Sequence, residues 1–248
     1  MTPPLPHEQP AAPALLDLVD ASLRDEDGAR VLQRLTQLAA RLPGVDAASC
    51  SLADHDGHLL RTAASSTAAH QLERLQDELR EGPCLDSRLI SKPLTDVPIT
   101  HPHSRVRWPR FTPSALKAGF AAVTALPIRH DQRVWGSLNL YHRHGALLPA
   151  DVREGQLLAT ATAICLLHQD SLRASQERER QLRTALDSRV LIEQAKGILS
   201  ERLECSVTDA FDLLRRHARS NRMKLVELAH VIVHSPPGTG PFPRDRSR

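Results

Sequence analysis

Residues 186–234 read LDSRVLIEQAKGILSERLECSVTDAFDLLRRHARSNRMKLVELAHVIVH, and this stretch decides the fold of the C-terminal part of the chain. Its apolar residues recur at helical spacing in three groups, the first continuous with a long helix from upstream. Ser206, three residues before Asp209, is typical of the start of the second helix, and Asn221 is expected to end it in a left-handed conformation. Three such apolar stripes pack on one another, so the pattern predicts a small three-helix bundle.

A glycine lies inside the first of these helices. Gly197 follows Lys196 there, and a glycine costs about 0.5–1 kcal/mol relative to alanine inside a helix. Two explanations are open: another helix packs closely against this position, or a binding partner touches the backbone there.

Three segments, SR..IEQAKGIL, DAF.LLR..A and KL.ELA..IV, together resemble an ANTAR domain, the RNA-binding module of bacterial transcription antiterminators, over residues 180–235. The resemblance implies a partner RNA with paired short hairpins, each with a hexanucleotide loop, in messenger leaders. Charged groups suit phosphates and base edges, an amide both donates and accepts, and a glycine lets the backbone approach. The candidate RNA-binding residues are accordingly Arg189, Gln194, Lys196, Gly197 and Arg215. Phe211 is assigned to the core stripe, which excludes base stacking on an aromatic side chain.

The upstream part alternates helices with strand pairs. Helical spacing predicts a helix over 14–42 with an interruption near 27–28, and another over 68–80. Strands are predicted at 45–53 and 58–65, at 94–97, and at 121–129 and 132–141. Residues 98–114 are rich in Pro, His and Arg and are predicted to be a long loop, with a short helix over 115–119. The order predicts an α+β fold with an antiparallel sheet and flanking helices.

The segments EGPCLD, W..F...ALKAGF.A.TALPI......WGSLNLY and LPADV resemble a GAF domain over residues 14–170. EGPCLD in particular resembles GAF domains that precede ANTAR domains in actinobacteria. The resemblance implies a sensor with a small-molecule pocket at residues 82–118, for which Cys84, Trp108 and Phe111 are the candidate ligand-binding residues. Neither the ligand nor any cofactor is specified by the sequence.

Cys84 has two interpretations, a redox-active thiol beside a cation or a partly buried structural cysteine, and the second is favoured. Its combination with His101 and His103 matches no metal-site spacing, so no metal site is predicted. The four cysteines form no CxxC pair, which argues against a disulfide framework.

The long helix is predicted from residue 151 to 185 and onward as a linker. Apolar residues along it fit an approximate heptad seam at Leu158, Ala161, Cys165, Leu172, Leu182 and Leu186. Polar residues interrupt this seam, which favours a weak, adjustable two-stranded contact over a rigid coiled coil. We therefore favour a homodimer over a monomer.

The remaining sequence features concern location and charge. No apolar run approaches the about 20 residues needed to span a bilayer, and no signal-peptide pattern is present, so a cytoplasmic protein is expected. Residues 1–13 and 236–248 are expected to be disordered. Residues 1–170 hold 17 Lys/Arg against 19 Asp/Glu and residues 171–235 hold 12 against 9, so an anionic partner is expected at the C-terminal half.

These features predict a signal-responsive RNA-binding regulator of transcription termination, with no catalytic residues. One alternative is a DNA-binding helical regulator, which the apolar third helix KLVELAHVIVH disfavours. The other is a thiol reductase of the GAF type that uses Cys84, which would need a second thiol nearby.

Overall fold

The computed structural model describes residues 11–24, 28–54, 56–236 and 241–242. It divides into two compact units, the first ending at Ser171 and the second beginning at Leu172. Residues 1–10 and most of 236–248, where disorder is expected, lie outside the described residues. The first helix begins at Ala11, so the expectation of a disordered start is wrong for residues 11–13.

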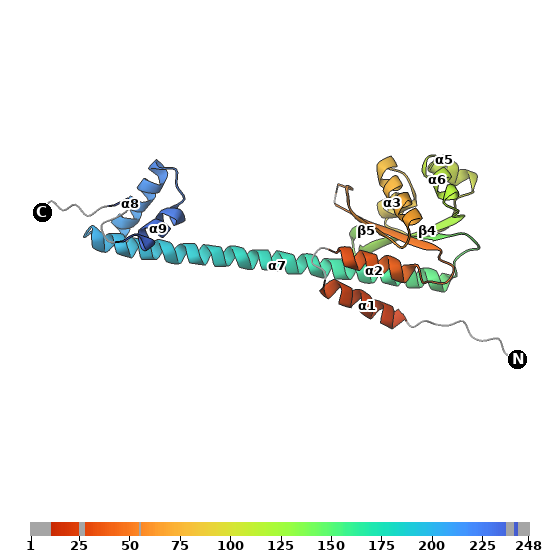
Figure 1. The fold of residues 1–248 in the computed structure, drawn as a ribbon, viewed down its shortest axis with the longest axis horizontal. Coiled ribbons are helices and arrows are strands. Elements are labelled where there is room, and N and C mark those ends of the chain that lie inside the picture. The colour runs from red at the N-terminus through yellow and green to blue at the C-terminus, as the bar shows by residue number, and fades with distance from the viewer. Residues whose placement is uncertain (1–10, 25–27, 55, 237–240, 243–248) are drawn as a thin grey trace. The chain divides into compact units, whose positions relative to one another are not determined.

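Unit 1 is built on a five-stranded antiparallel sheet with the strand order β2-β1-β5-β4-β3 (Figure 1). The strands are β1 Ala47–Ala53, β2 Leu59–Ala64, β3 Leu94–Pro98, β4 Ala122–His130 and β5 Arg133–His142. The predicted sheet of two hairpins and one further strand is confirmed.

Seven helices of the described residues belong wholly or partly to unit 1. They are α1 Ala11–Leu23, α2 Ala29–Ala39, α3 Thr67–Leu79, α4 Pro83–Ile90, α5 Pro102–Arg107, α6 Phe111–Lys117 and the first part of α7 Pro149–Arg202. The predicted loop over 98–114 is wrong because it contains α5 and the start of α6, and α4 was not predicted. Pro83 and Pro102 open their helices. A proline at the first helical position needs no N–H partner, so it starts a helix instead of preventing one.

The alternation of side chains along the strands separates two apolar cores. Leu138 and Leu140 of β5 face the core shared with α1, α2 and α7, whereas Tyr141 faces the core shared with α3 and α6. Figure 1 shows α3, α5 and α6 across the sheet from α2 and α7. Leu158 and Cys165 of α7 are 2% and 7% exposed and lie in the first core. The predicted heptad seam is therefore wrong at these two residues, since they pack on their own sheet.

Unit 2 is a three-helix bundle, as predicted, made of the end of α7, α8 Val207–Ser220 and α9 Leu225–His234. Its buried residues are Ala195, Leu199, Ala210, Leu214, Ala218, Leu228, Ala229 and Ile232. Ser206 caps α8, because its Oγ accepts the Asp209 N–H at 3.1 Å and donates to the Asp209 carboxylate at 2.6 Å. The left-handed residue after α8 is Arg222 (φ 53°) and not Asn221 (φ −99°), which corrects the predicted cap. Among the described residues, no helix is both long enough and apolar enough to span a membrane.

Candidate functional site

Gly197 lies on the exposed side of α7 in unit 2. A Cβ atom added at this position would meet no heavy atom within 4 Å among the described residues. Close packing of another helix therefore does not explain the glycine. The other explanation, that a binding partner approaches the backbone, is the one that this geometry leaves open.

Lys196 lies where α7 and α8 face each other. Its Nζ donates to the Glu193 carboxylate at 2.8 and 2.9 Å and stands 5.2 Å from the ring centroid of Phe211. Its side chain is only 17% exposed, so Lys196 is held in place rather than extended into solvent. Arg215, one turn after Phe211 on α8, places its Cζ 5.6 Å from the same ring. Lys196, Arg215 and Phe211 therefore form one cluster from two helices.

The other predicted residues are placed by the geometry of α7. Arg189 is exposed and lies seven residues before Lys196, which puts the two on the same side of the helix about two turns apart. Gln194 is also exposed, but two residues before Lys196 corresponds to about 160° around the helix. The structure thus brings Arg189, Lys196, Arg215 and Phe211 to one side, with Gly197 between that side and Gln194.

Phe211 is a residue that the sequence interpretation misplaced. It is partly buried and does not belong to the core of unit 2, whose contributions from α8 are Ala210, Leu214 and Ala218. That stripe is complete at a spacing of four residues, and Phe211 lies about 100° to one side of it. The basic residues at Arg215 and Arg219, one and two turns later, are the signal that would have identified this as a surface row.

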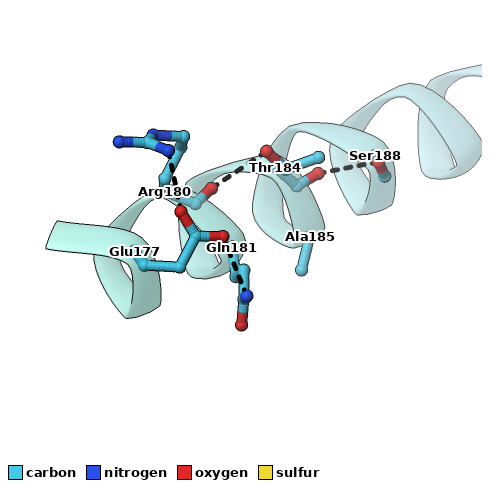
Figure 2. Close-up of a pocket in the computed structure, with 6 residues that line it drawn as sticks. All are labelled: Glu177, Arg180, Gln181, Thr184, Ala185 and Ser188. Carbon is cyan, nitrogen blue, oxygen red and sulfur yellow. Dashed lines mark hydrogen bonds and ion pairs between the residues drawn. The ribbon is translucent and has the colours of Figure 1, made fainter. Parts of the chain in front are cut away.

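A shallow surface hollow occurs upstream on α7 (Figure 2). It is lined by Glu177, Arg180, Gln181, Thr184, Ala185 and Ser188, all on one side of the helix. Glu177 accepts hydrogen bonds from Arg180 at 2.7 Å and Gln181 at 3.0 Å. All these residues come from a single helix and their polar groups pair within it, so the hollow offers no enclosed ligand site.

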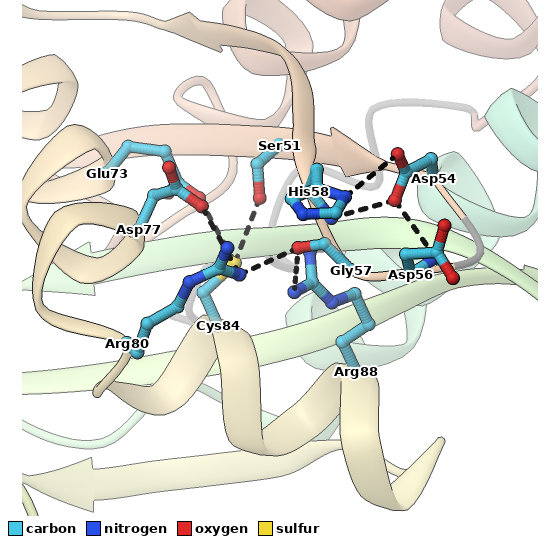
Figure 3. A network of polar contacts seen from close by, with 10 residues as sticks. All are labelled: Ser51, Asp54, Asp56, Gly57, His58, Glu73, Asp77, Arg80, Cys84 and Arg88. Atoms are coloured by element: carbon cyan, nitrogen blue, oxygen red, sulfur yellow. Dashed lines mark hydrogen bonds and ion pairs between the residues drawn. The ribbon is translucent and has the colours of Figure 1, made fainter.

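Unit 1 contains a buried polar cluster between the sheet and helices α3 and α4. Glu73 of α3 is 2% exposed, and its carboxylate accepts hydrogen bonds from Ser49, Asn139 (2.8 Å) and the Cys84 thiol (3.0 Å). The Ser51 hydroxyl lies 3.1 Å from Cys84 Sγ (Figure 3). The Asn139 Oδ1 atom is buried and has no hydrogen-bond partner among the described residues. Of this cluster, only Cys84 lies in the segment 82–118, where the sequence predicts the ligand pocket.

The chemistry of Cys84 follows from this environment. Burial and then the nearby Glu73 carboxylate raise the pKa of the Cys84 thiol well above its ordinary value of 9.0. A buried thiol with a raised pKa is a poor nucleophile. Cys50 lies between Ser49 and Ser51 on β1, so alternation puts it in the opposite core, where its thiol faces the Leu32 carbonyl. The thiol reductase alternative therefore lacks both a reactive Cys84 and an adjacent second thiol.

The EGPCLD segment, residues 81–86, fastens α4 to its surroundings. Glu81 accepts the backbone N–H groups of Arg110 and Phe111, both at 2.6 Å, at the start of α6. Gly82 (φ 134°) leaves space for the Gln76 side chain, whose Oε1 accepts the Cys84 N–H at 2.9 Å. Asp86 accepts the Trp108 Nε1–H at 2.9 Å.

Trp108 and Phe111 themselves are core residues. They are 3% and 0% exposed and meet edge to face with their centroids 6.2 Å apart. They therefore hold α5 and α6 against the sheet. Of the three predicted ligand-binding residues, Cys84 alone lies in the polar cluster.

The turn between β1 and β2 carries a second group of polar residues (Figure 3). Arg80 and Arg88 both donate to the Gly57 carbonyl, at 2.9 and 3.4 Å. Asp54 accepts the His58 N–H at 2.8 Å, which lowers the pKa of Asp54. Asp54, Asp56 and His58 are the one group of metal-ligating side chains found close together in the described part of the chain, and all are exposed. His101, His103 and Cys84 are not brought together as a set of ligands.

Comparison with protein families agrees with both units. A family model described as a GAF domain matches residues 26–166, more than half of the chain. The chain belongs to the GAF family. A second model, described as an ANTAR domain, matches residues 180–233, so this is a GAF–ANTAR protein. A search of curated proteins gives no match.

Solved structures support the same fold for unit 1 of this GAF–ANTAR chain. The GAF domain of an Acinetobacter phosphoenolpyruvate-protein phosphotransferase has a TM-score of 0.50 at 13% identity and covers 66% of this chain and 97% of its own. The Coxiella burnetii counterpart gives 0.50 at 14% identity, with 66% and 96% covered. Residues 122 to 287 of a methyl-accepting chemotaxis protein give 0.50 at 15% identity, with 63% and 99% covered. At these identities the likeness concerns the fold alone.

The two domains together identify a signal-responsive regulator, with a GAF sensor in the first unit and an ANTAR domain in the second. ANTAR domains imply RNA as the partner of the regulator, and GAF domains imply a small-molecule ligand. The pairing agrees with the expectation of a regulator rather than an enzyme.

Proposed function

We propose that this GAF–ANTAR protein is a transcription antiterminator that binds paired short hairpins with hexanucleotide loops in nascent messenger RNA. By holding the two hairpins, it prevents the competing terminator hairpin from forming or changes access to a ribosome-binding site. The sensor domain comprises residues 14–170, the helix from 151 to 185 serves as the linker, and the RNA-binding domain comprises residues 180–235.

The observation that carries this proposal is the glycine in the ANTAR unit. Gly197 lowers helix stability by about 0.5–1 kcal/mol, and its position would accommodate a Cβ without any contact within 4 Å. A residue that lowers stability and makes no packing contact indicates that something other than folding, such as binding of a partner, requires it. Close approach of an RNA backbone or loop is such a requirement.

The charges around the glycine suit RNA. Arg189 and Arg215 are exposed, and no acidic side chain of the described residues pairs with either within 4.0 Å. Both are therefore available for phosphates, and Arg219, one turn beyond Arg215, extends the basic row along α8. Gln194, on the other side of Gly197, suits the edge of an unpaired base.

A homodimer presents two such surfaces to two hairpins. Exposed apolar residues support this assembly, because Leu16, Val19 and Leu23 of α1 are 69%, 44% and 71% exposed at helical spacing. On α7 the exposed large apolar residues are Leu157, Ile164, Leu167, Leu172, Leu182, Leu186 and Val190. In the proposed contact between two copies, Leu172, Leu182 and Leu186 of the predicted seam are kept, and the other exposed residues take the place of Leu158 and Cys165.

The signal acts on the sensor unit, where the cluster of Glu73, Cys84 and Asn139 is the proposed ligand-responsive region. A ligand shifts the dimer between states only if its affinity for the two states differs. The proposed consequence is a change in dimerisation or in the register of α7 that alters RNA capture.

The test is direct binding of the full chain to a transcript that carries two hexaloop hairpins, measured by gel shift at several salt concentrations. We expect Lys196→Ala to weaken binding about tenfold and to reduce the salt dependence by the equivalent of about one phosphate contact. Arg178→Ala is the matched control, since it removes one positive charge from the exposed part of α7 that precedes the RNA-binding domain. We expect this control to bind like the unaltered chain.

Comparing the affinity for the hairpin pair with the affinity for duplex DNA decides between an RNA-binding and a DNA-binding regulator. A chain that binds duplex DNA as tightly as the hairpin pair, or that binds neither, contradicts the proposal. Equal losses in Lys196→Ala and Arg178→Ala would show that net charge, and not the Gly197 surface, governs the interaction.

A further inference from the structure

The position of Phe211 is not accounted for by the core of unit 2. Its ring is partly exposed beside Gly197's neighbour Lys196, whereas the core of α8 is formed by Ala210, Leu214 and Ala218. Two cations, Lys196 at 5.2 Å and Arg215 at 5.6 Å from the centroid, accompany the ring. The two cations are attracted to the negative face of the Phe211 ring. They also attract any anionic group of a ligand that binds at the ring.

We propose that Phe211 is the platform on which one unpaired loop base of the RNA stacks, a specificity that rests on the RNA-binding function proposed above. A planar base has a π face that matches an aromatic ring, and only bases that are unpaired, as in a hairpin loop, can present it. The platform therefore selects looped RNA over a continuous duplex.

The two cations have different tasks in this arrangement. Lys196 is anchored by Glu193 and is 17% exposed, so it stays beside the ring and receives the phosphate of the stacked nucleotide. Arg215 is exposed and has no acidic partner among the described residues. It moves to the outer face of the base, because a guanidinium plane stacks on bases as well as on phenyl rings. The base thus lies between Phe211 and Arg215.

The test uses the full chain, with Phe211→Leu as the variant and Phe211→Tyr as the matched control. Leucine keeps the apolar volume but removes the π face, and tyrosine keeps both. We expect Phe211→Leu to lose roughly 5- to 150-fold in affinity for the two-hairpin transcript, and Phe211→Tyr to stay within about twofold. Equal affinity of the leucine variant and the unaltered chain overturns the inference.

A series of abasic transcripts separates stacking from a general structural effect. One loop nucleotide at a time is replaced by an abasic ribose, which keeps the phosphate but removes the base. We expect one loop position at which the loss of the base weakens binding to the unaltered chain but not to Phe211→Leu. If removal of the base weakens binding to the unaltered chain and to Phe211→Leu equally at every loop position, no base stacks on Phe211 and the inference fails.

A photocrosslink tests the contact without any protein substitution. Transcripts with 5-iodouridine at single loop positions are irradiated in complex with the unaltered chain, and the crosslinked peptide is identified by mass spectrometry. The expected crosslink is at Phe211, and crosslinking only elsewhere in unit 2 overturns the inference while leaving RNA binding intact. A chain that binds no transcript at all overturns the proposed function, and the inference with it.

Discussion

Two glycines within helix α7 have opposite surroundings. A Cβ at Gly155, in the GAF unit, would lie 3.0 Å from Leu126 Cδ1 and 3.1 Å from Leu140 Cδ1, so the helix can approach the sheet only because the side chain is absent. A Cβ at Gly197, in the ANTAR unit, would meet nothing within 4 Å. Within one helix, the first glycine is explained by the fold and the second is not.

The same contrast holds for the polar residues of the two units. In the GAF unit Glu73 and Cys84 are buried and hydrogen-bonded to one another, so their chemistry is enclosed. In the ANTAR unit Arg189 and Arg215 are exposed. The difference is that the hydrogen-bonding groups of the first unit are enclosed in its interior, whereas the basic side chains of the second are open at its surface.

The largest effect is expected at a third glycine, in the sheet of the GAF unit. A Cβ at Gly136 would lie 1.8 Å from the Ser51 carbonyl oxygen, which is backbone and cannot turn away. Gly136→Ala should therefore force β1 and β5 apart and lower the free energy of unfolding by more than about 3 kcal/mol. Urea unfolding followed by circular dichroism measures this.

The matched control is Gly145→Ala, at a turn with open space around the added Cβ but with φ at +68°. Its left-handed backbone should cost about 1–2 kcal/mol. If Gly136→Ala proved as stable as this control, the close approach of β1 and β5 would not be the reason for the glycine.

The stability of the folded chain should fall at high pH because two thiols of the GAF unit are buried. Burial raises the pKa of both Cys50 and Cys84 well above 9.0 in the folded chain. The folded state therefore binds these protons more tightly than the unfolded state, and the stability they give is complete below pH 9.0 and is lost as pH rises toward the raised pKa values. The loss approaches about 1.4 kcal/mol per pH unit for each thiol.

Cys84→Ala should roughly halve the decline that the two thiols cause between pH 9 and 10, as measured by urea unfolding at each pH. Gly145→Ala lowers stability without removing a thiol, so it should keep the full slope. An unchanged slope in Cys84→Ala would mean that this thiol ionises alike in the folded and unfolded chain.

Helical periodicity predicts the bundle because each of its helices buries one side. Strands β1, β4 and β5 are buried on both faces, and they are predicted from their composition and from the turns that separate them. Sequence patterns fail between residues 81 and 114, because they predict neither α4 nor α5, whose first residues are Pro83 and Pro102. Helices of eight and six residues carry too few turns to show a stripe. These two helices are held by contacts between residues far apart in the sequence, such as the hydrogen bond that the Trp108 Nε1–H donates to Asp86.

The sequence predicts less of the candidate sites than of the fold. The cluster around Glu73 joins α3, α4, β1 and β5, and residues 66 positions apart meet in the bond from Asn139 to Glu73. No local pattern indicates such a meeting. On the ANTAR surface the charged residues were predicted by type, but Phe211 was assigned to the core because an apolar residue beside Ala210 is usually buried.

The smallest effect in stability is expected at the glycine that the fold does not explain, and it has the opposite sign to that of Gly136. Gly197→Ala should raise the free energy of unfolding of the bundle by about 0.5–1 kcal/mol, because alanine favours the helix and its Cβ meets no neighbour. The same substitution should weaken binding to the two-hairpin transcript, because the added methyl group lies where the RNA approaches. Thermal unfolding and gel shift, performed on the same sample, measure the two effects. An alanine variant that is both more stable and equally tight in binding would leave Gly197 without a function at the RNA surface, and a destabilised variant would show that a packing role exists after all. Gain of stability together with loss of binding is the outcome that only a surface shaped for an external partner produces.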